Sequence, residues 1–360
     1  MQIMDALLIN VLNQFQLDAP AVSCERYGCG HINVTYLVVT ESGRRYILQK
    51  ISNRAFPDVE GLQENIAAVT RHLHTQIDNP YGALTLIPTL DGKTYLHVEE
   101  NSDWRVYDFI EGSICLQSPE TPEDFYQSAI AFGTFQQQLA GFPAETLHET
   151  IKNFHNTPDR FRIFKEVLAK DVMGRAKECQ AEIDFVLAHE EIGAQLTNML
   201  KEGKLPLRVT HNDTKLNNVM LSESSRTPLC VIDLDTTMPG LSAYDFGDSI
   251  RFGAATAAED EKDLSKMEMN LDLFRIFTRG FRTACPGLTE NERKALPLGA
   301  LTMTLECGTR FLTDYLDGDH YFGIHRPEHN LDRCRTQFKL VRDMESKWDE
   351  MAKIIEEESK

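Results

Sequence analysis

Four polar residues between positions 209 and 233 have the types and spacing that phosphoryl transfer needs. His211, Asp213 and Asn218 follow the order H-x-D-x-x-x-x-N, and Asp233 comes fifteen residues later, at the end of a short apolar run. Transfer of phosphate from ATP needs a carboxylate beside the attacking hydroxyl and oxygen ligands that hold Mg²⁺ on the phosphates. We therefore predict Asp213 as the catalytic base. We predict Asn218 and Asp233, which carry the hard oxygen donors that Mg²⁺ prefers, as metal ligands.

The residues around this pattern have several interpretations. Asp235 follows Asp233 by two positions, so both carboxylates would point the same way in an extended segment; Asp235 is either a second metal ligand or a hydrogen-bond partner of the substrate. Lys215 either contacts the γ-phosphate or is an exposed loop lysine. We expect His211 to brace the loop rather than to carry a proton. We expect Asp245, in the stretch YDFGDSIRF, to accept backbone amides and hold the loop in place.

Strand patterns dominate the first hundred residues. Two β-rich runs flank the turn at Glu41–Arg44 and predict a hairpin, and two further strands follow before residue 110. Between them, apolar residues at helical spacing predict a helix over 60–76. The expected strands cover residues 36–40, 45–49, 94–98 and 104–109.

After residue 112 the pattern becomes helical. Thr121, Pro122 and Asp124 form a helix start, with a capping threonine, a proline at the first helical position and an acid three residues after the cap. An apolar stripe predicts a C-terminal helix from Asp332. Short strands are expected at 207–210 and 229–234, on either side of the Asp213 loop.

The segment Tyr107–Gly112 separates these two patterns and is expected to link two lobes. The fold class is therefore α+β, with a small antiparallel β-rich N-lobe and a larger, mainly helical C-lobe. We place the nucleotide-binding lobe at residues 1–108 and the catalytic and substrate-binding lobe at residues 109–360. Tyr107 and Phe109 are expected to contact the nucleotide.

A glycine pair marks a second nucleotide contact. Gly28, Gly30 and Asn33 lie just before the first strand pair, and glycines let backbone amides approach a phosphate closely. The same G-x-G pattern also occurs in plain hairpins. On the following strand, the register puts Gln49 where ATP-dependent kinases usually have a phosphate-binding lysine, and it turns Lys50 to the opposite face. We expect Gln49 to line the nucleotide site and leave the identity of the phosphate-binding basic residue open.

The Asp213 and Asp233 loops resemble those of the kinase-like phosphotransferases, the group of aminoglycoside phosphotransferases and choline kinase. Between residues 27 and 331 the chain is also similar to N-acetylhexosamine 1-kinases of the bifidobacterial type, through stretches such as NFHNTPDRF, LRVTHNDTKLNN, IDLDTTMPG, ECGTRFL and PEHNL. The resemblance implies a bilobal protein-kinase-like fold. It also implies transfer of phosphate from ATP, with Mg²⁺, to the anomeric hydroxyl of N-acetylglucosamine or N-acetylgalactosamine. Gln49 in place of lysine would then be a family trait.

The same resemblance implies a sugar pocket formed by His31, Arg310 and Tyr321, with Asp213 beside the reacting hydroxyl. From the residues alone, Arg310 could equally be a surface charge on a helix, and His31 a loop residue bonded to backbone. The alternative function is a kinase-like phosphotransferase acting on another small hydroxyl compound, such as an aminoglycoside, an amino alcohol or a different hexose. A catalytically inactive nucleotide-binding scaffold would usually lack the base or a metal ligand, and both are present here.

Composition excludes other classes of partner. The chain has 360 residues, 37 Lys and Arg against 55 Asp and Glu, and a net charge of −18, which argues against binding nucleic acid or an anionic membrane surface. The eight cysteines form no C-x-x-C pair, which suits reduced thiols in a cytoplasmic protein. We expect a cytoplasmic enzyme whose partners are ATP and a small sugar. The oligomeric state is left open.

Overall fold

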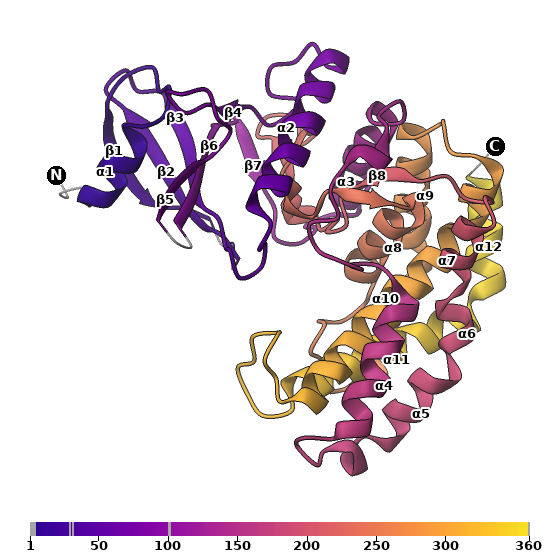
Figure 1. Ribbon diagram of the computed structural model, residues 1–360. Helices are drawn as coiled ribbons and strands as arrows, with labels where there is room; N and C mark the ends of the chain where they lie inside the picture. The colour runs from indigo at the N-terminus through magenta and orange to yellow at the C-terminus, as the bar shows by residue number, and fades with distance from the viewer. Residues whose placement is uncertain (1–4, 29, 31, 100–101, 359–360) are drawn as a thin grey trace. The chain divides into compact units, whose positions relative to one another are not determined.

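The chain forms two compact units, each assembled from separate stretches of sequence (Figure 1). The structure is a computed structural model that describes residues 5–28, 30, 32–99 and 102–358. Asp213 and Asn218 belong to the second unit, and Asp233 belongs to the first. The first unit contains Met1–Ile114, Glu145–Lys152 and Met220–Met238, and the second contains Cys115–Ala144, Asn153–Val219 and Pro239–Lys360.

An antiparallel sheet forms the body of the first unit. Its central hairpin, β2–β3, confirms the predicted one, and Gly43 in the turn has φ +86°, which glycine adopts without a clash from a Cβ atom. Val38, Leu48 and Val106 pack in one core with the N-terminal helix α1. The strands are, in spatial order, β1 (Ala21–Arg26), β2 (Val34–Thr40), β3 (Arg45–Lys50), β6 (Ser102–Asp108) and β4 (Leu86–Ile87); β5 (Leu96–Glu99) also pairs with β6, and α1 is Ala6–Leu12.

The register between β3 and β6 determines which side chains share a face. Gln49 lies opposite Arg105, and Lys50 lies opposite Trp104. The amine of Lys50 lies 5.7 Å from the centre of the Trp104 ring, whereas Gln49 bonds to Arg105, so the two neighbours face opposite sides of the sheet as predicted.

The remaining parts of the first unit are a helix and a smaller sheet. The helix α2 (Val59–Gln76) confirms the predicted one, and the small sheet has the order β10 (Pro228–Val231), β9 (Val219–Ser222) and β7 (Ser113–Cys115). Strand β10 ends before Asp233, which has φ 59° and starts the short 3₁₀ helix η4 (Leu234–Thr236). The expectation that Asp233 and Asp235 share an extended segment was therefore wrong, because the backbone turns into the left-handed region at Asp233.

The second unit is helical (Figure 1). Helix α3 begins as predicted, with a capping box in which Thr121 and Asp124 each accept from the other's backbone amide. The helices are α3 (Pro122–Gln138), α4 (Thr157–Lys170), α5 (Gln180–Ala188), α6 (Glu190–Gly193), α7 (Gln195–Lys201), α8 (Ser242–Gly253), α9 (Leu271–Ala284), α10 (Glu290–Asp317), α11 (His329–Ser346) and α12 (Trp348–Glu357). The short elements are η1 (Ala144–Thr146), η2 (Ala176–Glu178), η3 (Leu216–Asn218), η5 (Leu264–Lys266), and the paired strands β8 (Arg208–Thr210) and β11 (Met238–Gly240).

Helices α8 and α10 cross at very short range, through glycines. A Cβ atom on Gly247 of α8 would lie 2.3 Å from the carbonyl oxygen of Gly299 of α10. Such a distance is far below van der Waals contact, so the crossing depends on the missing side chains. Helix α8 follows the Asp213 loop in sequence and carries Asp245 and Asp248. The close crossing thus anchors the helix that holds the loop.

The C-terminal stripe forms two helices rather than one. Helix α11 ends at Ser346 and α12 begins at Trp348, and the amine of the intervening Lys347 bonds to the carbonyl oxygen of Met269 at 2.9 Å and to Asp343 at 2.7 Å. Most of the predicted stripe is nevertheless buried, as core packing requires. In the part of the chain that the structure describes, no helix is long and apolar enough to cross a membrane.

Candidate active site

His211 is buried at the start of the Asp213 loop. Its ring lies edge-on to Phe132 and Phe135 of α3, with centroid distances of 5.5 and 6.0 Å. Its Nδ1 atom accepts the backbone N–H of Asp213 at 3.3 Å. His211 therefore braces the loop, as expected.

Asp245 holds the same loop from helix α8. Its carboxylate accepts the backbone N–H groups of His211 at 3.0 Å and Asn212 at 2.8 Å, and the side-chain amide of Gln136 at 2.7 Å. Its backbone oxygen accepts the hydroxyl of Thr214 at 2.6 Å. Burial raises the pKa of Asp245, while the charge of His211 and the amide donors oppose that rise. This confirms the prediction that Asp245 accepts backbone amides.

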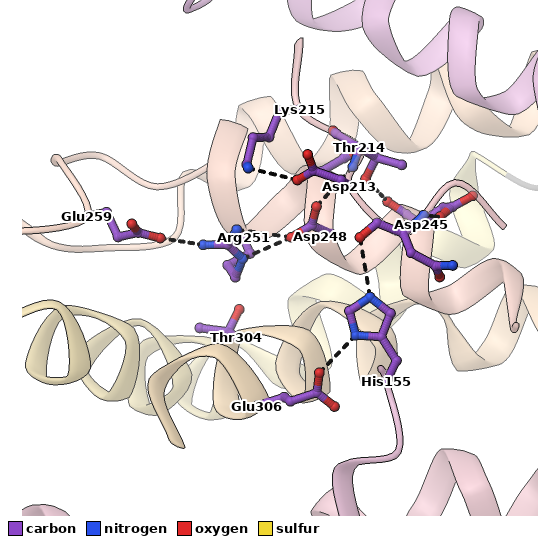
Figure 2. Close-up of polar contacts among 12 residues, drawn as sticks. His155, Asp213, Thr214, Lys215, Asp245, Asp248, Arg251, Glu259, Thr304 and Glu306 are labelled. Atoms are coloured by element: carbon purple, nitrogen blue, oxygen red, sulfur yellow. Dashed lines mark hydrogen bonds and ion pairs between the residues drawn. The ribbon is translucent and has the colours of Figure 1, made fainter. Parts of the chain in front are cut away.

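The structure brings Asp213, Lys215 and Asn218 together, and Figure 2 shows the pairing of Lys215 with Asp213. The side-chain amide nitrogen of Asn218 donates to the backbone oxygen of Asp213 at 2.8 Å and to its Oδ2 atom at 3.1 Å. The amine of Lys215 pairs with Oδ1 of Asp213 at 2.7 Å. Burial lowers the pKa of Lys215, but the charges of Asp213 and Asp248 outweigh burial, so the net shift is upward. Lys215 is thus a paired cation beside the proposed base.

Asp248 forms a second support, which the sequence reasoning did not assign. Its Oδ2 atom accepts the backbone N–H of Thr214 at 3.0 Å, and its Oδ1 atom accepts two N–H groups of Arg251 at 3.1 and 3.0 Å. Arg251 also donates to Glu259 at 2.7 Å (Figure 2). The spacing of three residues between Asp248 and Arg251 on a helix is the signal that could have identified this pair.

His155 is a further contact that the sequence did not indicate. Its Nδ1 atom lies 2.8 Å from Glu306 of α10, and its Nε2 atom lies 3.3 Å from the carbonyl oxygen of Asn212 (Figure 2). Asn212 has φ +66°, in the left-handed region, immediately before Asp213. The three partners are distant in sequence, and nothing in their spacing predicts that they meet.

In the first unit, Arg105 of β6 places a buried guanidinium beside Gln49, the position on β3 where a lysine is usual in ATP-dependent kinases. Its guanidinium donates to both carboxylate oxygens of Asp235, at 2.5 and 2.9 Å, and donates twice to Oε1 of Gln49, at 2.9 and 2.8 Å. Asn33 also donates to Asp235, at 2.5 Å. Burial acts to lower the pKa of Arg105, but the charge of Asp235 outweighs burial, so the net shift of the pKa is upward. Arg105 lies opposite Gln49 across β3 and β6, and this register, which the sequence alone does not provide, is what identifies it.

The carboxylate of Asp235 is occupied by Arg105 and Asn33. Both of its oxygens hold side chains of its own unit, and Asn33 also accepts the backbone N–H of Ser52 at 2.9 Å. Asp235 therefore links β6, η4 and the segment before β2. We assign it a structural role between these elements.

The other predicted nucleotide contacts lie in the same unit. Gly28 has φ +76°, and no atom lies within 4 Å of the position that its Cβ would take. Tyr27 contacts Phe109 edge-on with a centroid distance of 6.1 Å, and Tyr107 is buried beneath the guanidinium of Arg105, whose carbon lies 5.2 Å from the ring centre. Gly30 is described, whereas His31, the predicted sugar contact, lies outside the described residues.

Arg310 and Tyr321, the two remaining predicted sugar contacts, lie together in the second unit. A guanidinium nitrogen of Arg310 donates to the Tyr321 hydroxyl at 3.3 Å. The guanidinium carbon lies 5.4 Å from the ring centres of Phe154 and Phe322 and 5.6 Å from that of Tyr321. Tyr321 itself is 67% exposed. The structure thus places a cation among three aromatic rings, one of which, Phe154, immediately precedes His155 in the sequence.

A family model described as the phosphotransferase enzyme family, APH, matches residues 23–267, which is more than half of the chain. The chain belongs to this family. Solved structures with similar folds include a microcompartment-associated aminopropanol kinase (TM-score 0.65, 17% identity, 96% of this chain and 98% of that one) and a choline kinase from Cryptosporidium parvum (0.60, 12%, 96% and 97%). An amicoumacin kinase in complex with AMP-PNP and Ca²⁺ is also similar (0.59, 13%, 95% and 93%). These likenesses confirm the predicted bilobal protein-kinase-like fold.

The extent of the family match divides the site of this phosphotransferase into two parts. The Asp213 loop, Asn218 and Asp233 lie inside the matched residues. Arg310 and Tyr321 lie beyond them, on α10 and on the segment that follows it. The family match therefore covers the loop and Asp233 but not Arg310 or Tyr321.

Proposed function

We propose that this phosphotransferase is an ATP- and Mg²⁺-dependent kinase that phosphorylates the anomeric hydroxyl of N-acetylhexosamines, giving the sugar 1-phosphate. The observation that carries the kinase part is the loop geometry, in which Asp213 is held by Asn218 and paired with Lys215. The sugar part is supported by the resemblance in stretches such as NFHNTPDRF and ECGTRFL. Residues 1–108 are proposed to bind the nucleotide and residues 109–360 to carry the catalytic loop and bind the acceptor.

In this proposal each residue of the loop has a separate task. Asp213 orients the anomeric hydroxyl and accepts its proton as the hydroxyl oxygen bonds to the γ-phosphorus of ATP and the bond from that phosphorus to the departing ADP breaks. Lys215 places a positive charge beside that carboxylate, where it faces the charge that develops on the transferred group. His211 and Asp245 keep the loop fixed, so that the base does not have to reorganise during the reaction.

The metal proposal rests on donor chemistry. Asn218 bonds to the loop through its amide nitrogen, so the coordinating atom would be the amide oxygen on its other branch. Asp233 is exposed, at the point where the backbone turns. Both are hard oxygen donors and so fit Mg²⁺. The ion, when bound, would supply positive charge that neutralises the phosphate oxygens.

A neutral acceptor suits the second unit better than a cationic one. Arg310 and Arg160 both act on the same buried carboxylate, Glu306, so two cations lie on this side of the unit. An aminoglycoside or an amino alcohol brings positive charge, which these arginines would repel. A sugar needs directional donors and aromatic surface, which Arg310 and Tyr321 offer. We keep the cationic acceptors as the alternative, and we also propose a cytoplasmic location, where thiols stay reduced.

A panel assay tests the proposal. ADP release is measured with N-acetylglucosamine, N-acetylgalactosamine, galactose, glucose, mannose, choline and kanamycin, and phosphorus NMR locates the phosphate on the product. We expect turnover of the N-acetyl sugars and a phosphate coupled to the C1 proton. Phosphate at C6, or turnover of choline or kanamycin alone, would replace this proposal with the alternative.

A further inference from the structure

We propose that His155 is a positioning residue for the catalytic loop, which as an imidazolium bound to Glu306 holds the carbonyl group of Asn212 and so fixes the backbone from which Asp213 projects. The inference rests on the proposed function only in taking Asp213 as the residue that acts on the acceptor. It adds a role for two residues outside the loop motif, one of which lies beyond the region matched by the family model.

Asn212, the residue before Asp213, is held at both its N–H group and its C=O group. This residue has φ +66°, in the left-handed region, which asparagine adopts more readily than most non-glycine residues. Asp245 holds the N–H group of Asn212 at 2.8 Å, and His155 holds its C=O group at 3.3 Å. The two hydrogen bonds therefore fix both the N–H group and the C=O group of Asn212. The C=O group belongs to the peptide that joins Asn212 to Asp213, so its orientation sets the start of the Asp213 backbone.

Both ring nitrogens of His155 face hydrogen-bond acceptors. Its Nδ1 atom lies 2.8 Å from a carboxylate oxygen of Glu306, and its Nε2 atom lies 3.3 Å from a backbone carbonyl oxygen. An ionised carboxylate and a carbonyl only accept hydrogen bonds, so both ring nitrogens must donate for both bonds to form. Only the doubly protonated ring has two N–H groups. The hydrogen bonds of His155 to Glu306 and to the Asn212 carbonyl therefore form together only in the imidazolium form, and the neutral ring loses one of them.

Glu306, which bonds to Nδ1 of His155, is itself buried and hydrogen-bonded. Glu306 is 2% exposed and also accepts the hydroxyl of Thr157 at 2.7 Å. Burial would raise the pKa of Glu306, but the charge and hydrogen bond of His155 hold it below the ordinary range. The charge of His155 also acts to lower the pKa of Asp248, on α8. Arg160 and Arg310 add to the lowering at Glu306 and are the positive charges that oppose His155.

Aromatic rings complete the environment of His155. The ring of Tyr244, on α8, has its centroid 5.3 Å away, and that of Phe154 lies 4.5 Å away. Neither ring competes for the two N–H groups. The titratable and charged groups that face or act on the imidazole are thus Glu306 and Asp248, with Arg160 and Arg310 acting through Glu306 and Tyr244 beside the ring.

Two substitutions of His155 test its two hydrogen bonds separately. In His155→Asn the amide nitrogen takes the place of Nδ1, so the bond to Glu306 is kept and the Asn212 carbonyl is released. In His155→Gln the amide nitrogen reaches as far as Nε2, so the bond to Asn212 is kept without a titrating group. Both variants remove the positive charge beside Glu306, so a merely structural role predicts similar losses of stability and of activity in both.

The positioning role predicts a difference in kcat. His155→Asn should lower kcat by roughly 10- to 100-fold, because a small misplacement of a catalytic group costs up to about that factor. His155→Gln should recover most of that loss, and the KM values for ATP and acceptor should change by less than about 3-fold in both.

Hydrogen exchange gives a readout that needs no acceptor. The peptide covering residues 209–215 should exchange faster in His155→Asn than in the wild type or in His155→Gln. If the wild type phosphorylates a different acceptor, the proposed function fails, and the kinetic comparison proceeds with that acceptor. If no acceptor is turned over, the exchange comparison decides. Equal exchange in all three proteins, or kcat in His155→Asn within about 2-fold of wild type, would overturn the positioning role.

Discussion

At the scale of single residues, Asp213 depends on a few neighbours that each fix one degree of freedom. Asn218 holds its Oδ2 atom, Lys215 pairs with its Oδ1 atom, and His211 accepts its backbone N–H. A base held in this way reaches the transition state without reorganising. The same contacts define what a substitution would remove, because the carboxylate can be changed to an amide of the same shape.

Asp213→Asn is the first prediction at this scale. The amide cannot accept a proton at neutral pH, so kcat should fall by roughly 10²- to 10⁴-fold, the usual range for loss of a general base. An anomeric hydroxyl is more acidic than an ordinary alcohol, so the loss should lie toward the lower end. Nucleotide Kd, measured by titration calorimetry, should change little, and the exposed Asp272→Asn serves as the control. A collapse of nucleotide affinity with kcat preserved at saturation would show that Asp213 is a binding residue.

The second residue-scale prediction concerns the metal. EDTA should abolish turnover and Mg²⁺ should restore it, because the bound ion would supply the positive charge that neutralises the phosphate oxygens. Asp233→Ala should lose most of kcat even with Mg²⁺ in excess, whereas Asp235→Asn should lower the melting temperature, since Asp235 holds Arg105. ADP release and a thermal melt distinguish the two variants. Near-normal turnover by Asp233→Ala would remove Asp233 from the ligand set.

At the scale of elements, helix α8 transmits the packing of the second unit to the loop. Asp245 and Asp248 lie one turn apart on α8 and together hold the backbone N–H groups of His211, Asn212 and Thr214. The position of α8 is in turn set by its crossing with α10, where Gly247 meets Gly299. A shift of this helix would move the loop without changing any residue of the motif.

Gly247→Ala tests this transmission. The added methyl group would lie 2.3 Å from the Gly299 carbonyl oxygen, so the helices must separate, at a cost of roughly 1–3 kcal/mol for overpacking. The melting temperature and kcat should both fall, since α8 carries the residues that hold the loop. Gly141→Ala, where no atom lies within 4 Å of the new Cβ, is the matched control and should do neither. Unchanged kcat in a destabilised Gly247→Ala would mean that the loop is insensitive to α8.

Patterns that are local in sequence predicted elements well. The hairpin β2–β3, the helix α2 and the Thr121 capping box all follow from spacing within one segment, and all three are present. The role of Asp245 followed from its place just after the loop. These features could be predicted because their determining contacts lie within a few residues of one another or within one motif.

Features set by distant contacts could not be predicted. The left-handed turn at Asp233 and the break at Lys347 depend on surroundings rather than on local propensity. Arg105 and His155 meet their partners across separations that range from about fifty to more than a hundred residues. Identifying them required either the strand register or the packing of helices, which one sequence alone does not provide.

At the scale of the whole molecule, acidity shapes stability. The chain carries a net charge of −18 at pH 7, so acid brings protons to many carboxylates. Several of these are buried against cations, among them Glu306 with His155 and Glu292 with Arg208. Burial would raise the pKa of Glu292, but its bonds to Arg208 and Thr289 hold the pKa below the ordinary value of 4.5. Such groups bind protons more tightly in the unfolded chain than in the folded one, so acid favours unfolding.

Glu292→Gln is the prediction at this scale. The folded-state pKa of Glu292 is lowered, so its contribution to stability is complete above about pH 4.5 and is lost as the pH falls through the folded value. At pH 7 the variant should lose about 2 kcal/mol of unfolding free energy, the usual scale for a hydrogen bond to a charged group. It should lose less than the wild type on further acidification, because one of the titrating carboxylates is gone. Urea unfolding between pH 7 and 3.5 measures both effects.

Glu290→Gln supplies the matched comparison two residues earlier in the same helix. Glu290 is exposed and pairs with Lys294 on the surface, so its loss should leave the unfolding free energy at pH 7 nearly unchanged. The difference between the two variants isolates the buried pair from the general effect of removing one negative charge. If Glu292→Gln retains the acid sensitivity of the wild type, the carboxylates that control acid unfolding lie elsewhere. Glu306→Gln would then be the next variant to titrate, because its partner His155 also holds the catalytic loop.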